Sequence, residues 1–127
     1  MSAQTPPVAR LAMVTLDCAE VAPEAAFWAA LLGWEVAVAT DDYAMLTHGP
    51  ARLGFGRVEG HVPPSWPDEG GRKQVHLDLA VDDLDEAAQR AVALGASLVD
   101  PQPGETWRVL LDPAGHPFCL TDAAAWG

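Results

Sequence analysis

The segment VHLDLAVDDLDEAAQRAVALGA, residues 75–96, decides the fold of this chain. Its first residues alternate between apolar and polar, as in a half-buried strand, and its second part repeats apolar residues at helical spacing. Asp82 and Asp83 favour the start of a helix by capping and by charge, and Gly95 favours its end. The segment therefore predicts a strand over residues 74–81 and a helix over residues 84–94.

The same order of elements occurs once before in the chain. A strand pattern precedes a helical pattern that ends at Gly33, and three short strand patterns follow each helix. The expected strands are residues 11–19, 34–40, 43–48, 51–58, 96–100, 106–111 and 116–122, and the first helix is residues 22–32. Laying the first half over the second with one constant offset places Leu16 on Leu79 and Phe55 on Phe118. Such an internal repeat predicts two tandem βαβββ modules in a single α+β domain.

The modules are separated by a connector rich in proline and glycine. We expect the first module at residues 11–58, the connector at residues 59–73 and the second module at residues 74–121. The two cysteines, Cys18 and Cys119, lie far apart in apolar strand patterns, which favours reduced, buried thiols over a disulfide.

Composition excludes several classes of partner. The 127 residues are 50% hydrophobic, enough for one ordinary core, and they carry 18 Asp and Glu against 7 Lys and Arg. The formal net charge of -11 predicts no binding to nucleic acid or to anionic membrane surfaces. No apolar run is long enough to cross a bilayer, and the first residues lack the apolar core of a signal peptide. We therefore expect a cytoplasmic protein.

The repeat and its motifs resemble a known superfamily. The segment at residues 76–96 opens the second half, and LLDPAGHPFCL, residues 110–120, closes it. This plan resembles the vicinal oxygen chelate superfamily, which includes glyoxalase, extradiol dioxygenases, and fosfomycin and bleomycin resistance proteins. The run from residue 55 to residue 85 is similar to glyoxalase-like domains common in bacterial genomes. The resemblance implies two curled mixed sheets that form a cup with helices on the outer face, usually completed by a homodimer.

Strand alternation predicts which residues face the cup. In the second module an apolar row suits packing against helices, so His76 and Asp78 share the opposite, concave face. That row is Val75, Leu77, Leu79 and Val81. In the first module the same argument sends Val14, Leu16 and Cys18 to the helices and turns Met13, Thr15 and Asp17 inward.

The resemblance also implies where a metal would bind. Metal-dependent members take one His or Glu ligand from the first and last strand of each module, and the matching positions here are Met13, Gly56, His76 and Cys119. Only His76 is of the expected type, so a hard cation such as Mg²⁺ finds almost no ligands. Zinc needs at least three protein ligands, and beside His76 and Cys119 the sequence leaves open Asp78, His48, His61 or His116 as a further one. We therefore predict no metal or other cofactor.

Two interpretations stay open for several individual residues. His76 either contacts a ligand or is packed and hydrogen-bonded without a special role, and Cys119 is interpreted as a small buried hydrophobe rather than a nucleophile. Trp66, in the loop PPSWP, covers either a sheet edge or dimer contact or the pocket itself. Arg57 or Arg108 either pairs with an anionic group of the ligand or lies on the outer face.

We expect the pocket to take a small organic molecule with a flat or apolar body. Its predicted residues are Met13, Thr15, Gly56, His76, Asp78, Trp107, Cys119 and Trp66. The favoured hypothesis is a metal-free binding protein of the bleomycin-resistance kind. One alternative is a lyase, isomerase or dioxygenase, which uses a metal through relocated ligands or uses His76 and Asp78 as acid and base without one. A third is a module for protein association, suggested by the acidic surface and the tail DAAAWG.

Overall fold

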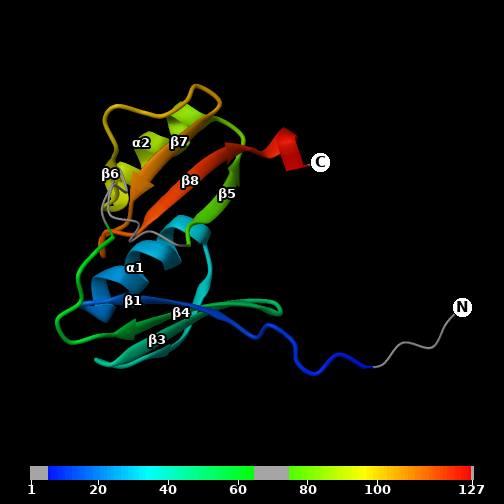
Figure 1. Cartoon of the computed structure of the whole chain (residues 1–127), viewed down its shortest axis with the longest axis vertical. Coiled ribbons are helices and arrows are strands. Elements are labelled where there is room, and N and C mark those ends of the chain that lie inside the picture. Colours follow the sequence, from blue (N-terminus) through cyan, green and yellow to red (C-terminus); the bar gives the residue numbers. More distant parts are fainter. Residues whose placement is uncertain (1–5, 65–74, 127) are drawn as a thin grey trace, which may run out of the picture.

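The computed structural model describes residues 6–64 and 75–126, which form two similar halves (Figure 1). The elements of the first half are β1 (Val14–Cys18), α1 (Val21–Leu32), β2 (Glu35–Ala39), β3 (Tyr43–His48) and β4 (Ala51–Arg57). Those of the second half are β5 (Leu77–Val81), α2 (Leu84–Leu94), β6 (Ser97–Leu98), β7 (Trp107–Leu111), β8 (Pro117–Asp122) and the short 3₁₀ helix η1 (Ala123–Trp126). The expected order of strands and helices is therefore present in both halves.

Each half contains one mixed sheet of four strands. Sheet A has the order β1-β4-β3-β2 and sheet B the order β5-β8-β7-β6. In each sheet the first and last strands of the module pair in parallel, and the other pairs are antiparallel. The prediction of an α+β fold with two βαβββ modules is confirmed.

The strand register corrects one detail of the repeat. Leu16 pairs with Phe55 in sheet A, whereas Leu77, and not Leu79, pairs with Phe118 in sheet B. One constant offset therefore does not describe both strands. The bounds of β1 and β5 and the N-caps Glu20 and Asp83 keep the offset that matches Leu16 to Leu79, so the shift lies in the last strands, where Phe55 corresponds to Leu120. With that offset Met13 remains the first-module counterpart of His76.

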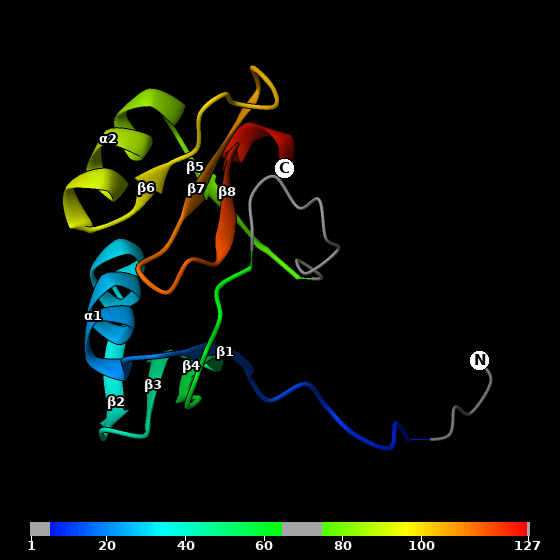
Figure 2. The same cartoon turned by 60° about the vertical axis from the view of Figure 1, so that its left-hand side comes forward.

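Helix α1 lies between sheet A and the second half in both views (Figures 1 and 2). Trp28 is fully buried there, and its ring meets those of Phe27 and Phe118 at centroid distances of 5.4 and 5.1 Å. Leu77, Leu79 and Val81 of β5 pack against this core, as the alternation predicted. Val75 does not, because β5 begins at Leu77 and the Val75 side chain is 67% exposed.

A buried polar cluster links the two halves. The Trp28 indole N–H donates to Asp112 Oδ2 at 2.9 Å, and Glu24 Oε1 accepts from the Ala114 N–H at 3.1 Å. Asp112 Oδ1 accepts from the N–H groups of Ala114 and His116. Glu24 is only 1% exposed, and this burial, together with the neighbouring Asp112 carboxylate, raises the pKa of Glu24 to about 9. Glu24 is therefore protonated at neutral pH.

Candidate functional site

A cavity of about 640 Å³ opens on the face of sheet B that carries His76; we call it the sheet-B cavity. The residues that line it are His76, Asp78, Thr106, Trp107, Cys119, Thr121, Asp122, Ala125 and Trp126. Four of the residues predicted from the sequence are thus brought together: His76, Asp78, Trp107 and Cys119. Every lining residue comes from the second half of the chain.

Alternation along β5 and β8 explains why these side chains meet. Asp78 pairs with Cys119 in the parallel ladder, and the next pair along is Leu79 with Leu120. Successive residues of a strand point to opposite faces, so the polar pair and the leucine pair lie on opposite sides of sheet B. The leucine pair lines a different hollow, on the helix side of the sheet.

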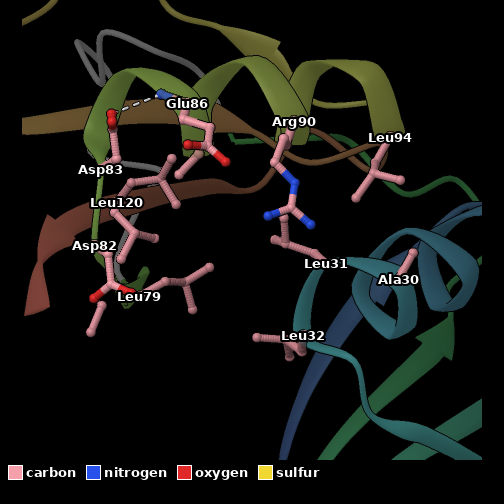
Figure 3. A pocket seen from close by; sticks show the side chains of 13 residues that line it. Ala30, Leu31, Leu32, Leu79, Asp82, Asp83, Glu86, Arg90, Leu94 and Leu120 are labelled. Atoms are coloured by element: carbon pink, nitrogen blue, oxygen red, sulfur yellow. Dashed lines mark hydrogen bonds between the residues drawn. The ribbon is translucent and has the colours of Figure 1, made fainter.

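That second hollow, of about 420 Å³, lies between α1, α2 and sheet B (Figure 3). Leu31 and Leu94 form part of its wall, and the Arg90 side chain extends from α2 towards Leu31. Asp83 stands at the start of α2 and caps it by accepting a hydrogen bond from the Glu86 N–H at 3.0 Å. None of the predicted pocket residues that the structure describes lines this hollow.

His76, Asp78 and Cys119 form a compact group of metal-binding side chains. His76 Nε2 lies 3.4 Å from Asp78 Oδ1, and one ligand atom from each of the three residues lies within 4.8 Å of the others. Both His76 and Asp78 are about 40% exposed, and Cys119 is half-buried. The group therefore faces the cavity instead of the core.

Two tryptophans bound the sheet-B cavity. Trp107, on β7, is 37% exposed, and a Cβ at Gly104 would overlap its ring, so the indole lies directly against the loop at Gly104. Trp126, in η1, is 63% exposed and donates its indole N–H to Thr121 Oγ1 at 2.7 Å. Thr121 in turn donates to the Leu79 carbonyl at 2.8 Å, which ties the C-terminal helix to sheet B.

Trp126 was missed at the sequence level. The tail DAAAWG suggested only protein association, because no periodic pattern showed that the chain turns back after β8. A usable signal is Asp122, which begins the turn by accepting a hydrogen bond from the Ala124 N–H at 2.9 Å. An Asp followed by three alanines and a tryptophan is compatible with a short helical turn that carries the indole back over the sheet.

The two candidate arginines point elsewhere. Arg108 Nη2 lies 3.2 Å from Asp85 Oδ1 on α2, and Arg108 Nη1 donates to the carbonyls of Glu105 and Trp107. Arg57 Nη1 lies 3.9 Å from Asp42 Oδ1. Neither lines the sheet-B cavity, whose ionisable residues are His76, Asp78, Asp122 and Cys119. The outer-face alternative is therefore the one that the structure supports for both arginines.

The first-module residues of the predicted pocket lie on sheet A. Met13 packs close to Gly54, where a Cβ would come within 2.8 Å of its sulfur, and a Cβ at Gly56 would meet Thr15 Cγ2 at 3.7 Å. Thr15 lines a separate cavity of about 710 Å³ with Asp17, His61 and His116, among others. A single chain does not bring Met13, Thr15 or Gly56 to the sheet-B cavity. Trp66 lies outside the described residues.

The three other histidines do not join the group of His76, Asp78 and Cys119. His116 Nε2 lies 2.6 Å from the carbonyl oxygen of Asp17, and its ring is 5.6 Å from that of His61. His48 stacks on Trp34 at a centroid distance of 5.7 Å. Of the supplementary ligands considered from the sequence, Asp78 is the one that joins His76 and Cys119.

The comparisons with known proteins agree with this architecture. The family model for the glyoxalase-like domain matches residues 13–121. The chain belongs to the glyoxalase-like domain family. The match spans both βαβββ modules of this glyoxalase-like chain, as the resemblance to the vicinal oxygen chelate superfamily predicted. A search of curated proteins found no match in sequence.

Solved structures show the same fold at low sequence identity. A glyoxalase/bleomycin resistance protein/dioxygenase family enzyme from Burkholderia phytofirmans PsJN superposes with a TM-score of 0.70 at 19% identity, covering 91% of this chain and 99% of that one. The bleomycin-binding protein of Streptomyces verticillus, solved with copper(II)-bleomycin, gives 0.58 at 22% identity, with 91% and 98% covered. A fosfomycin resistance protein from Mesorhizobium loti gives 0.65 at 17% identity, with 92% and 93% covered.

No helix within the described part of the chain combines the length and the apolar character needed to cross a membrane. The cytoplasmic location expected from the sequence stays a prediction.

Proposed function

We propose that this glyoxalase-like protein binds a small organic molecule with a flat, apolar body in the sheet-B cavity. The observation that carries the proposal is the pair of partly exposed indoles, Trp107 and Trp126, which line one cavity of about 640 Å³ with His76 and Asp78. Cavities of several hundred Å³ with apolar walls and a few convergent polar groups are typical small-molecule sites. The bleomycin-binding neighbour of similar fold supports the same class of function.

The charges that line the cavity indicate which ligand charge is favoured. Asp78 and Asp122 line it, whereas Arg57 and Arg108 are paired with carboxylates elsewhere. The whole chain carries a formal net charge of -11, which repels anions at long range. An anionic ligand is therefore disfavoured, and a neutral or cationic one is favoured, since a cation gains from both the carboxylates and the indole faces. This replaces the anionic group considered from the sequence.

A second copy of the chain would complete the cup. β1 and β5 each stand at the end of their sheet and pair on one side only among the described strands. Exposed strand edges of this kind are templates for pairing with another chain. The open faces of the two sheets line separate cavities within one chain, so a two-sided site needs sheet A of a partner opposite sheet B. We accordingly propose a homodimer.

The test is a titration followed by tryptophan fluorescence. The probes are planar bicyclic aromatic compounds that are neutral, cationic or anionic, together with bleomycin and copper(II)-bleomycin. We expect saturable binding of neutral or cationic probes, weakened about tenfold by Trp107→Ala and by Trp126→Ala. Trp34→Phe is the control, because Trp34 stacks on His48 away from the cavity. Absence of saturable binding, or equal binding by all three variants, contradicts the proposal.

A second candidate function is proton transfer on the bound molecule. The observation that favours it is the contact of 3.4 Å between His76 Nε2 and Asp78 Oδ1 within the cavity, since a carboxylate that orients an imidazole is a common acid–base arrangement. The assay uses the hemithioacetal of methylglyoxal and glutathione. We expect no turnover of this substrate by the wild type. If the wild type does turn it over and His76→Gln abolishes that turnover, the second function is favoured over simple binding.

A further inference from the structure

The metal site that the superfamily resemblance implies does not fit this chain. Its four positions hold Met13, Gly56, His76 and Cys119. A thioether, a glycine without a side chain and a thiol offer almost nothing to a hard cation that requires six oxygen or nitrogen ligands. Of these four positions, the two in the first module therefore supply no ligand of the expected kind, and the histidine and the thiol lie in the second module.

The second module instead assembles a different ligand set. His76 and Asp78 are two residues apart and face the same side of sheet B, and Asp78 pairs directly with Cys119 on the neighbouring strand. The position of this trio is set by backbone register, because adjacent parallel strands bring paired side chains of one face together. One imidazole nitrogen, one carboxylate oxygen and one sulfur all lie within 4.8 Å of one another.

These three donors suit zinc-like ions. Zinc binds Cys sulfur at about 2.3 Å and His or carboxylate donors at about 2.0–2.2 Å, so tetrahedral ligands stand roughly 3.3–3.7 Å apart. The His76–Asp78 separation of 3.4 Å already matches this spacing. The remaining separations, of at most 4.8 Å, close by small side-chain rotations at a half-exposed site. One thiolate and one carboxylate also balance the 2+ charge of the ion.

We propose that His76, Asp78 and Cys119 bind one borderline-soft divalent cation of the zinc type, through three protein ligands from sheet B alone. The fourth coordination position opens into the sheet-B cavity, next to Trp107 and Trp126. Three protein ligands with one open position is the arrangement of zinc sites that bind a water or a substrate. The site does not require the organic ligand, and it replaces the sequence-level prediction that no metal binds.

Cobalt(II) substitution tests the proposal directly. Purified full-length protein is stripped with a chelator, kept reduced, and titrated with Co²⁺ alone. We expect saturation at one ion per chain, with the visible bands of tetrahedral cobalt and a thiolate-to-cobalt charge-transfer band in the near ultraviolet. Zn²⁺ should displace the cobalt stoichiometrically, and excess Mg²⁺ should not.

Matched variants distinguish this site from adventitious binding. Cys119→Ser should abolish the charge-transfer band, while Cys18→Ala should keep it, because the Cys18 thiol is buried and lies near the Gly56 carbonyl. Asp78→Asn should weaken cobalt binding by about tenfold or more, while Asp122→Asn, in the same cavity but outside the trio, should leave it within about twofold. Circular dichroism checks that each variant folds.

The proposal is overturned if folded wild-type protein gives no charge-transfer band, if the band survives in Cys119→Ser, or if Mg²⁺ displaces cobalt as readily as Zn²⁺ does. Failure here leaves the titration with the planar aromatic probes and metal-free bleomycin unaffected, because that titration is carried out on chelator-stripped protein and reads tryptophan fluorescence. Conversely, if cobalt binds as expected and none of the organic probes binds, the metal inference is supported and the binding function is contradicted.

Discussion

The indole N–H of Trp28 donates to Asp112 Oδ2 at 2.9 Å across 84 residues of sequence. Trp28 belongs to α1 of the first half, and Asp112 to the turn between β7 and β8 of the second. Both side chains are buried, Trp28 completely. This hydrogen bond, with the adjacent Glu24, fixes one half of the molecule against the other in an otherwise apolar contact.

Trp28→Phe should lower the free energy of unfolding by about 2–4 kcal/mol. The substitution removes part of a fully buried ring and leaves Asp112 Oδ2 without its indole donor, and each loss destabilises the fold. Urea unfolding followed by circular dichroism measures the change. Trp34→Phe, at a partly buried site, should cost less. Equal losses in the two variants would mean that the Asp112 contact contributes nothing.

Glu24→Gln should flatten the pH dependence of stability. The pKa of Glu24 is about 9 in the folded protein and near 4.5 when unfolded, so unfolding releases a proton between these values. The stability that this protonated carboxyl contributes is fully present below pH 4.5 and is lost as the pH rises to about 9, by up to about 1.4 kcal/mol per pH unit. Glutamine cannot ionise, so this loss disappears.

The measurement for Glu24 is a series of urea unfolding curves from pH 5 to pH 9. The wild type should lose stability relative to Glu24→Gln across this range. Glu20→Gln is the control, because Glu20 is exposed just before α1 and should follow the wild type. Parallel pH profiles for wild type and Glu24→Gln would contradict a raised pKa at this site.

Gly104→Ala should displace Trp107 without unfolding the protein. The added Cβ would overlap the indole ring, which must then rotate away from the loop and change the wall of the cavity. We expect a shift in tryptophan emission and a weaker response to the aromatic probes. For probe binding the control is Trp34→Phe, since Trp34 stacks on His48 and does not line the sheet-B cavity. Unchanged probe binding in Gly104→Ala would place the ligand away from Trp107.

The proposed homodimer predicts a particle of twice the 13.4 kDa chain mass in light scattering coupled to gel filtration. It also predicts that a larger side chain on sheet A of one copy weakens ligand binding in the sheet-B cavity of its partner. Gly56→Leu should weaken probe binding although Gly56 does not line the sheet-B cavity of its own chain. A monomeric mass at the concentrations used for titration, or full probe binding by this variant, would contradict a cup shared between two copies.

The sequence was informative about the fold because each element has a local cause. Alternation, capping by Asp83 and the repeated order of elements predicted both modules and the family, and the structure and the family match bear this out. Alternation also predicted that His76 and Asp78 share a face opposite Leu79, which is where the two cavities place them.

The rest depended on features that a linear pattern does not carry. The difference in strand register between the modules becomes visible only when β1 and β5 are seen against their partner strands. The return of Trp126 over sheet B and the pairing of Arg108 with Asp85 depend on tertiary contacts. Asp78 could be considered as a third metal ligand from the sequence, but its distance from Cys119 follows from the ladder between two strands that are remote in sequence.

The two halves are similar but not interchangeable. When each helix is counted from its N-cap, Glu20 or Asp83, Trp28 of α1 and Ala91 of α2 occupy equivalent positions. Both side chains are completely buried. Glu24 likewise corresponds to Ala87. A chain built from two copies of the first half would thus place two large rings and two acidic groups where the interior accommodates one of each. The first half therefore supplies the large ring and the acidic group of the interior, whereas the proposed binding site lies in the second half.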